Sequence, residues 1–268
     1  MFKGKLILGL ALVALFSALL LLSNGTPRAL AQEIPQSDAQ GIPFAPDAPL
    51  PLDHFWCYQT TGQPVNEVVD TQDQFNVGGL VPIQVGAPIR FCNPVKKTHS
   101  GKVFKIKDPD AHLILYETGV AADLLVKVDV KNQFGNPQRL KVFGPAIRLA
   151  VPTQKEGHEF PQDLDHFKCY KVKGGPIDSV VGLKDQFQQV QAVNVGRAVL
   201  LCNPTRKIHN AQPFEVKHPE AHLVCYKVTP VQFTIIRGTQ NQFRQEQLQV
   251  QNPDLLCAPS RKQIVPNP

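Results

Sequence analysis

The sequence predicts an all-β protein of two tandem disulfide-stapled domains, each a β-sandwich or barrel formed by a pseudo-twofold pair of repeats of about 45 residues. Three observations predict this fold class. One multi-part motif occurs four times, apolar residues alternate with a period of two, and the 268 residues include 24 prolines. Proline removes a helical hydrogen bond and clashes with the preceding turn, so its abundance disfavours helices.

The N-terminal segment has the features of a secretory signal. Lys3 and Lys5 precede an apolar run at 6–22, and Ala29-Leu30-Ala31 offers small residues for a signal peptidase. We expect cleavage after Ala31. The alternative is an uncleaved membrane anchor, because the run is near the lower length limit for a bilayer span. The protein is therefore predicted to be secreted or periplasmic, which places its cysteines in an oxidising compartment.

A proline-rich linker is expected at residues 32–52, where prolines recur every few positions. Three of the 28 basic residues lie in the signal, so the remaining chain has 25 basic and 22 acidic residues and a net charge of +3. No basic run resembles a nucleic-acid-binding patch, and no nucleic-acid partner is expected.

Two domains are predicted because the same motifs return at an offset of about 110 residues. Asp-His-Phe-Trp-Cys-Tyr at 53–58 recurs as Asp-His-Phe-Lys-Cys-Tyr at 165–170. The expected boundaries are a first domain at 53–152, a linker at 153–164, a second domain at 165–262 and a tail at 263–268.

Each domain also repeats internally. The order is His-x-x-Cys-Tyr, then Asp/Asn-Gln-Phe, then Leu-Cys-x-Pro-x-x-Lys, and the four copies open at His54, His112, His166 and His222. One copy is too small to enclose a core, whereas two copies together, near 100 residues, are large enough. Each pair of copies is therefore expected to form one domain.

Six cysteines permit 15 pairings, and comparison of the copies selects one. Three copies hold two cysteines each, whereas the second has Leu115 and Ala150 at the two positions. A half-lost pair would leave a free thiol, so this joint absence indicates a bond within each copy. No Cys-x-x-Cys pair is present, and disulfides are preferred over a zinc site. The predicted bonds are Cys57–Cys92, Cys169–Cys202 and Cys225–Cys257.

Alternation locates the strands. Between 167 and 172, odd-numbered side chains are expected on one face and even-numbered ones on the other. Residues 124–130, 193–195 and 248–250 alternate similarly, and the Leu-Cys-x-Pro stretches suit strand ends, where proline is tolerated. Each copy is expected to supply three or four short strands.

The His-x-x-Cys-Tyr-Lys opening, the Asp/Asn-Gln-Phe centre and the Leu-Cys-x-Pro-x-x-Lys end, over residues 53–262, resemble an uncharacterised family of secreted bacterial domains, a domain of unknown function. The resemblance implies an exported β protein and implies no activity. The chain departs from the pattern at Leu115 and Ala150, where one bridge is missing.

Residues that recur in every copy are interpreted as scaffold. The four opening histidines would cap strands or bind turns, because one active site does not need four equivalent donors. Each glutamine would satisfy backbone groups beside a core phenylalanine. The four closing lysines would be solvated strand ends, with contact to an acidic surface polymer as the lesser alternative. These glutamines are Gln74, Gln133, Gln186 and Gln242, and the lysines are Lys97, Lys155, Lys207 and Lys262.

Three residues outside the fourfold pattern are candidates for binding. Trp56 is the only tryptophan, and the lysine at the matching position 168 indicates partial exposure, which would allow contact with a partner. His99 and His209 match each other once per domain in polar loops, as expected of a site.

We expect a non-enzymatic exported module for binding, adhesion or envelope structure, because no nucleophile elbow, phosphate loop or His-Glu-x-x-His motif is present. The expected partner is an extracellular or envelope glycan or protein, with no cofactor and no metal, and with membrane contact only through an uncleaved signal. Two alternatives are a secreted enzyme that uses His99 or His209 with a nearby acid, and metal binding through the repeat histidines.

Overall fold

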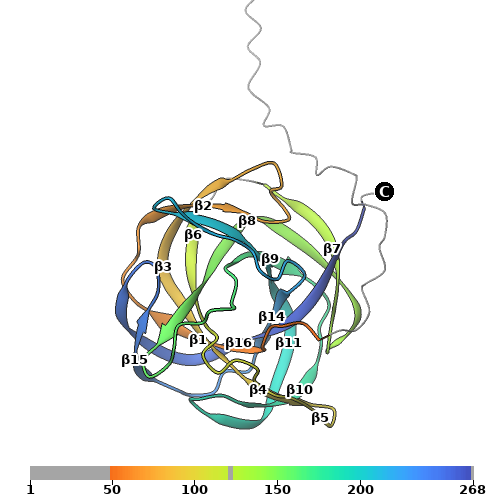
Figure 1. Ribbon diagram of the computed structural model, residues 1–268. Helices are drawn as coiled ribbons and strands as arrows, with labels where there is room; N and C mark the ends of the chain where they lie inside the picture. Colours follow the sequence, from red (N-terminus) through yellow and green to blue (C-terminus); the bar gives the residue numbers. More distant parts are fainter. Residues whose placement is uncertain (1–48, 120–122, 267–268) are drawn as a thin grey trace, which may run out of the picture. The chain divides into compact units, whose positions relative to one another are not determined.

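The computed structural model describes residues 49–119 and 123–266, whose strands are shown in Figure 1. These residues form a 16-stranded sheet and contain no helix, which confirms the all-β class. This part of the chain therefore has no helix with the length and apolar composition needed to span a bilayer. The expected signal at 1–31 and most of the linker at 32–52 lie outside the described residues.

Each of the four repeats supplies three strands. The first and second repeats give β1 (Phe55–Thr61), β2 (Glu67–Gln72), β3 (Val81–Pro94), β6 (His112–Gly119), β7 (Leu125–Asn132) and β8 (Gly135–Lys155). The third and fourth give β9 (Phe167–Lys173), β10 (Ser179–Lys184), β11 (Gln189–Pro204), β14 (His222–Val228), β15 (Ile235–Gln240) and β16 (Gln245–Ile264). Two short hairpins follow the first and third repeats: β4 (Lys96–His99) with β5 (Lys102–Phe104), and β12 (Arg206–His209) with β13 (Gln212–Phe214).

The first and third strands of every repeat close into a ring of eight antiparallel pairs. The order is β1, β3, β6, β8, β9, β11, β14 and β16, and β16 returns to pair with β1. In Figure 1 these strands surround the centre of the view. Because the ring is closed, each of these eight strands pairs with another strand on both sides.

The ring overturns the expected division into separate domains at 53–152 and 165–262. β8 of the second repeat pairs with β9 of the third along seven registered positions, and β16 pairs with β1. All described residues belong to one compact unit. The physical reason lies at the sheet edges. Two repeats alone would leave two ring strands with unpaired backbone groups, and the other two repeats satisfy them.

The middle strand of each repeat also pairs with a strand that belongs to, or directly follows, the repeat two positions along the chain. β2 pairs with β3 on one side and with β12, which follows the third repeat, on the other. β10 pairs with β11 and with β4, which follows the first repeat. β7 pairs with β8 and the end of β16, and β15 pairs with β16 and the end of β8. The first and third repeats therefore interlock, as do the second and fourth.

Alternate side chains of the ring strands enter two separate cores. The cysteine core contains the six cysteines with mainly aliphatic neighbours. The aromatic core contains Trp56 and the four tyrosines. On β9, Phe167 and Cys169 enter the cysteine core, whereas Tyr170 and Val172 enter the aromatic core. This is the alternation predicted for 167–172.

The three disulfides have the pairing that the repeats predict: Cys57–Cys92, Cys169–Cys202 and Cys225–Cys257. Each joins directly opposed positions on the first and third strands of its repeat. In the second repeat, Leu115 and Ala150 oppose each other at the matching position and are buried in the cysteine core. An apolar pair therefore takes the place of the fourth bridge.

Candidate functional site

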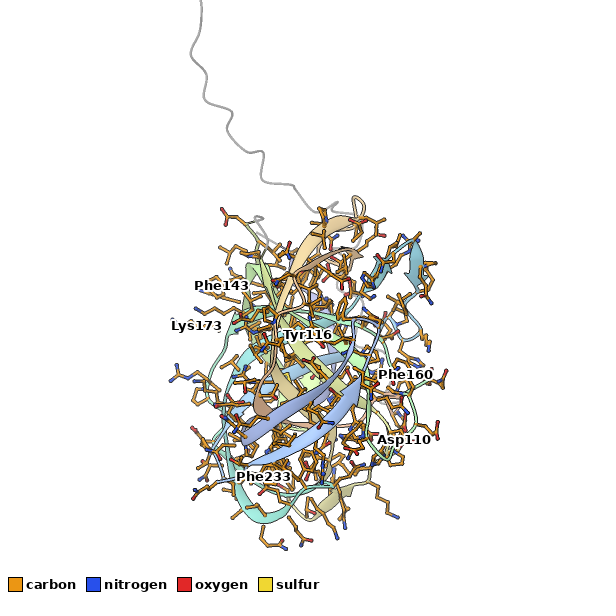
Figure 2. The ribbon with its side chains drawn as sticks, turned by 90° about the vertical axis from the view of Figure 1, so that its left-hand side faces the viewer. Asp110, Tyr116, Phe143, Phe160, Lys173 and Phe233 are labelled. Atoms are coloured by element: carbon orange, nitrogen blue, oxygen red, sulfur yellow. A yellow bond between two sulfur atoms is a disulfide. The ribbon has the colours of Figure 1, made fainter. Side chains whose placement is uncertain are left out.

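The Gln-Phe motifs connect repeats that are not neighbours in the ring. Each phenylalanine packs edge-on against the tyrosine of the repeat two positions along, with ring centroids 5.0–5.4 Å apart. Aromatic pairs favour this geometry. Figure 2 shows one partner, Tyr116, within the body of the strands. The four pairs are Phe75–Tyr170, Phe134–Tyr226, Phe187–Tyr58 and Phe243–Tyr116.

The residue that opens each motif completes the same contact. Asp185 of the third repeat accepts hydrogen bonds from the Tyr58 hydroxyl at 2.8 Å and from Asn93 Nδ2 at 3.0 Å, both in the first repeat. Burial raises the pKa of the Asp185 carboxyl. The equivalent carboxylate of Asp73 accepts from Tyr170 and Asn203 at 3.1 Å each. Both carboxylates therefore accept hydrogen bonds that join one repeat to another.

Where the motif opens with asparagine, the hydrogen bond reverses. Asn132 and Asn241 donate from Nδ2 to the hydroxyls of Tyr226 and Tyr116, at 2.8 Å each. In the second and fourth repeats, the position that corresponds to Asn93 of the first repeat holds an apolar residue, Val151 or Ala258. A motif that opens with aspartate, which only accepts hydrogen bonds, is thus matched by an asparagine donor in the repeat two positions away. A motif that opens with asparagine is matched by an apolar residue there.

The four closing lysines are not solvated strand ends, and that prediction was wrong. Lys97 and Lys207 are fully buried, Lys155 is 4% exposed and Lys262 is half-buried. Each ammonium group lies 4.2–5.8 Å from the ring centroid of the Gln-Phe phenylalanine in the next repeat. Burial lowers the pKa of Lys97, Lys207 and Lys262 to about 7, and that of Lys155 to about 8. Strand alternation continues past the proline and directs these side chains into the aromatic core, where the rings favour a cation.

The four opening histidines are also buried, as the scaffold interpretation requires. His112 and His222 are fully buried, and His54 and His166 are 7% exposed. Burial lowers the pKa to about 3 at His54 and His166 and to about 2 at His112, so these rings are neutral at physiological pH. Gln242 of the fourth repeat lies 2.8 Å from Nε2 of His166. Both ring nitrogens of His112 and of His222 lack a hydrogen-bond partner among the described residues, so the predicted contacts that cap strands or bind turns are not formed by these two.

Trp56 does not stand on the surface, contrary to expectation. It is fully buried in the aromatic core, 5.4 Å from Tyr58 between ring centroids. The inference from position 168 failed because Lys168 is itself 4% exposed and lies 3.5 Å from the carboxylate of Asp73. A buried lysine with a carboxylate partner gives no information about exposure. Trp56 therefore offers no exposed surface to a partner.

His99 and His209 occupy matching positions at the ends of β4 and β12 but differ in surroundings. Nε2 of His209 contacts the carboxylate of Glu67, and the residue is 8% exposed. His99 packs on Phe134 with centroids 5.3 Å apart, and burial lowers its pKa. Ser179 occupies the sequence position on β10 that Glu67 has on β2. Only one of the two predicted histidines is therefore paired with an acid.

Two observations on the described residues bear on the metal and enzyme alternatives. No group of three histidine, cysteine, aspartate or glutamate side chains in this part of the chain is close enough to hold a metal ion. An open groove on the third and fourth repeats is lined by Asp178, Ser179, Asn194, Gly196, Lys227 and Thr229, among others, and by no histidine. The four repeat histidines thus belong to no such metal-binding group within the described ranges.

The face formed by β7, β8 and β9 carries an uncompensated row of lysines, a feature that sequence reasoning missed. Lys127 directly opposes Lys141, and Lys141 directly opposes Lys173. We call these three residues the lysine row. Opposed side chains of an antiparallel pair share one face, with Cβ atoms about 5 Å apart. Lys141 and Lys173 are exposed, and no member of the row pairs with another described side chain.

The neighbours of the lysine row add charge and apolar surface. Lys171 opposes Phe143, which also opposes Leu125, a residue 67% exposed. Figure 2 shows Phe143 and Lys173 close together at one margin of the view. On the other side of the row, Arg139 binds Asp129 through two contacts of 2.8 Å and lowers the pKa of that carboxyl. The adjacent acid is thus already neutralised.

The matching row is uncharged in the other three repeats. Lys127 lies five positions before the asparagine of its Gln-Phe motif, and the residues so placed elsewhere are Val68, Val180 and Ile236. Their directly opposed partners are Gln84, Asn194 and Gln249. The cationic row therefore occurs only where the second repeat meets β9 of the third, and this break in the repeat pattern is the sequence signal that could have revealed it.

Comparison with known families gives one match. A family model described as a repeat of unknown function (DUF7450) matches residues 34–142 and again residues 120–259. The two matches together span most of the chain. No curated protein matches it, and no solved structure does.

Proposed function

We propose that this chain, which belongs to the DUF7450 family of repeats, is an exported non-enzymatic module that binds a component of the extracellular space or the cell envelope. One observation carries the proposal. Many of the polar residues that recur in the repeats, among them the four opening histidines and three of the closing lysines, are buried, so we infer that chemistry at the surface depends on residues that break the pattern. The lysine row is one such feature on the described surface.

Export from a bacterial cell is part of the proposal. The three disulfides are consistent with an extracellular or periplasmic location, because thiols stay reduced in the cytosol. The signal-like segment before residue 32 supports the same compartment. Secretion is tested by recovering the protein from the culture medium or periplasm and reading its N-terminus, which we expect to be Gln32.

Binding is tested by incubating the fluorescently labelled protein, from Gln32 onward, with cells of its native host. We expect saturable association with the cell surface and no change in the mass profile of released envelope fragments. Absence of saturable association would overturn the proposal. Release of new fragments in proportion to time and protein concentration would indicate an enzyme instead.

The contact between His209 and Glu67 favours a second candidate, a secreted hydrolase. A histidine held by a carboxylate is a common general base. This candidate requires that His209→Asn and Glu67→Gln each abolish fragment release, whereas His99→Asn, the matched control on β4, leaves it intact. For the binding module, none of the three substitutions changes surface association.

A further inference from the structure

We propose that the lysine row, Lys127, Lys141 and Lys173, is a binding site for an anionic polysaccharide. The inference rests on the proposed function and names its ligand class. Lysine ammonium groups suit carboxylate, sulfate or phosphate substituents, which they meet as flexible point charges. The three lysines come from three different strands, so the site does not appear in the sequence as a run of basic residues.

The first argument is electrostatic. Lysines that oppose each other directly repel and destabilise the strand pair. The scaffold does not require them, because the same positions hold Val68 with Gln84 and Ile236 with Gln249 in other repeats. Asp129, two positions from Lys127 on the same strand, is bound to Arg139. A repulsive cluster that the fold does not need is most simply explained by an anion that relieves it.

The second argument is geometric. Adjacent strands are about 4.8 Å apart, so the row spans about 10 Å across β7, β8 and β9. That length is comparable to a disaccharide unit, and several common anionic polysaccharides carry an acid group in each disaccharide. Lys171 lies beside the row and adds a fourth cation. A linear polymer laid across the strands, with one acid group in each disaccharide, would place successive acid groups near Lys127 and Lys173, with Lys141 between them.

The flanking residues favour a polysaccharide over other polyanions. Phe143 and Leu125 form the apolar border of the row, and an aromatic ring can pack against the C–H face of a sugar. Nucleic-acid channels use several aromatic platforms for successive bases, whereas this face has one ring. Membrane surfaces require a larger apolar face, and only Leu125 among these residues is a large, highly exposed hydrophobic.

The test uses the protein from Gln32 onward with heparin and polygalacturonate as probes, and with dextran, duplex DNA and anionic phospholipid vesicles for comparison. We expect both acidic polysaccharides to bind, dextran not to bind, and the association constant to fall steeply with salt, as for other polyelectrolytes. Tighter binding to DNA or to vesicles than to either polysaccharide would overturn the assignment.

The decisive variant is Lys127→Gln with Lys141→Gln and Lys173→Gln. We expect polysaccharide binding to weaken about tenfold or more. The matched control is Lys96→Gln with Lys105→Gln and Lys184→Gln, which removes the same charge from exposed positions and includes the directly opposed pair Lys96 and Lys184. An equal loss in the control would reduce the effect to net charge and overturn the site.

Folding does not confound the comparison, because removing the repulsion should leave the triple variant at least as stable as the wild type. The assay on host cells separates the two proposals. A triple variant that still binds cells like the wild type contradicts the lysine row as the site and leaves the binding module standing. A wild-type protein that binds no cells contradicts the proposed function itself.

Discussion

The hydroxyl of Tyr58 in the first repeat donates a hydrogen bond to Asp185 in the third, 127 residues away, at 2.8 Å. Tyr170 in the third repeat donates to Asp73 in the first at 3.1 Å. The exchange is therefore reciprocal, and each half of the chain completes the aromatic core of the other.

Neither half is expected to fold alone. Fragments 32–160 and 161–268, each prepared separately, should lack a cooperative unfolding transition, because the ring closes only through β8 with β9 and β16 with β1. Mixing the two under conditions that allow disulfide formation should restore a single transition. Calorimetry of each fragment and of the mixture measures this, and a cooperative transition in either fragment alone contradicts it.

The match between residue types across repeats predicts a rescue. Asp185→Asn places an amide donor against Asn93 Nδ2, also a donor, and should destabilise the protein by roughly 1–3 kcal/mol. Adding Asn93→Val gives the combination found between the fourth and second repeats, where the motif opens with Asn241 and the position of Asn93 holds Val151. The second substitution should therefore recover part of that loss. Urea unfolding of both single variants and the double variant gives the coupling energy. Additive losses would refute the matching rule, and exposed Asp178→Asn serves as the control.

Lys97 should make stability depend on alkaline pH. Its folded pKa is about 7, below the unfolded value of about 10.5, so the unfolded chain binds more protons between these values. Stability therefore rises with pH from about 7 to 10.5 and is independent of this group below 7. Lys97→Met keeps the stem and removes this dependence, so its stability relative to wild type should improve as pH falls towards 7. Exposed Lys141→Met should show no such trend in denaturant titrations at successive pH values.

The second repeat predicts that a bridge can be replaced by an apolar pair. Cys57→Leu with Cys92→Ala copies Leu115 and Ala150, and should fold natively while losing roughly 3–4 kcal/mol of stability through loop entropy. Thermal unfolding measures the loss.

Cys92→Ala alone should behave differently, because it leaves the Cys57 thiol 3.8 Å from the Cys257 sulfur, where its attack would form Cys57–Cys257 and release the Cys225 thiol. Non-reducing peptide mapping should then detect exchanged disulfides. Clean retention of Cys225–Cys257 in that variant would contradict the exchange.

Much of the local structure could be predicted because it depends on near neighbours or on comparison of copies. Alternation at 167–172 correctly separated Phe167 and Cys169 from Tyr170 and Val172, and the joint loss at Leu115 and Ala150 gave the disulfide pairing. The opening histidines are buried, but the ring nitrogens of His112 and His222 make no hydrogen bond among the described residues, so the predicted capping contacts are not seen there. The exposure of Trp56 and of the closing lysines was predicted wrongly, because burial depends on what covers a side chain and the covering residues come from other repeats.

The sequence by itself determined the all-β class, the four repeats, the three bridges and the alternation of each strand, since these follow from chemistry within one copy. Tertiary structure alone decided that the copies share one ring and that repeats two positions apart pack against each other through Phe75 with Tyr170 and the equivalent pairs. It also decided that Lys127, Lys141 and Lys173 lie on one face. The physical reason is that four near-identical copies offer equivalent strand edges. The motif cannot state which edge pairs with which, and only closure of the whole ring satisfies them all.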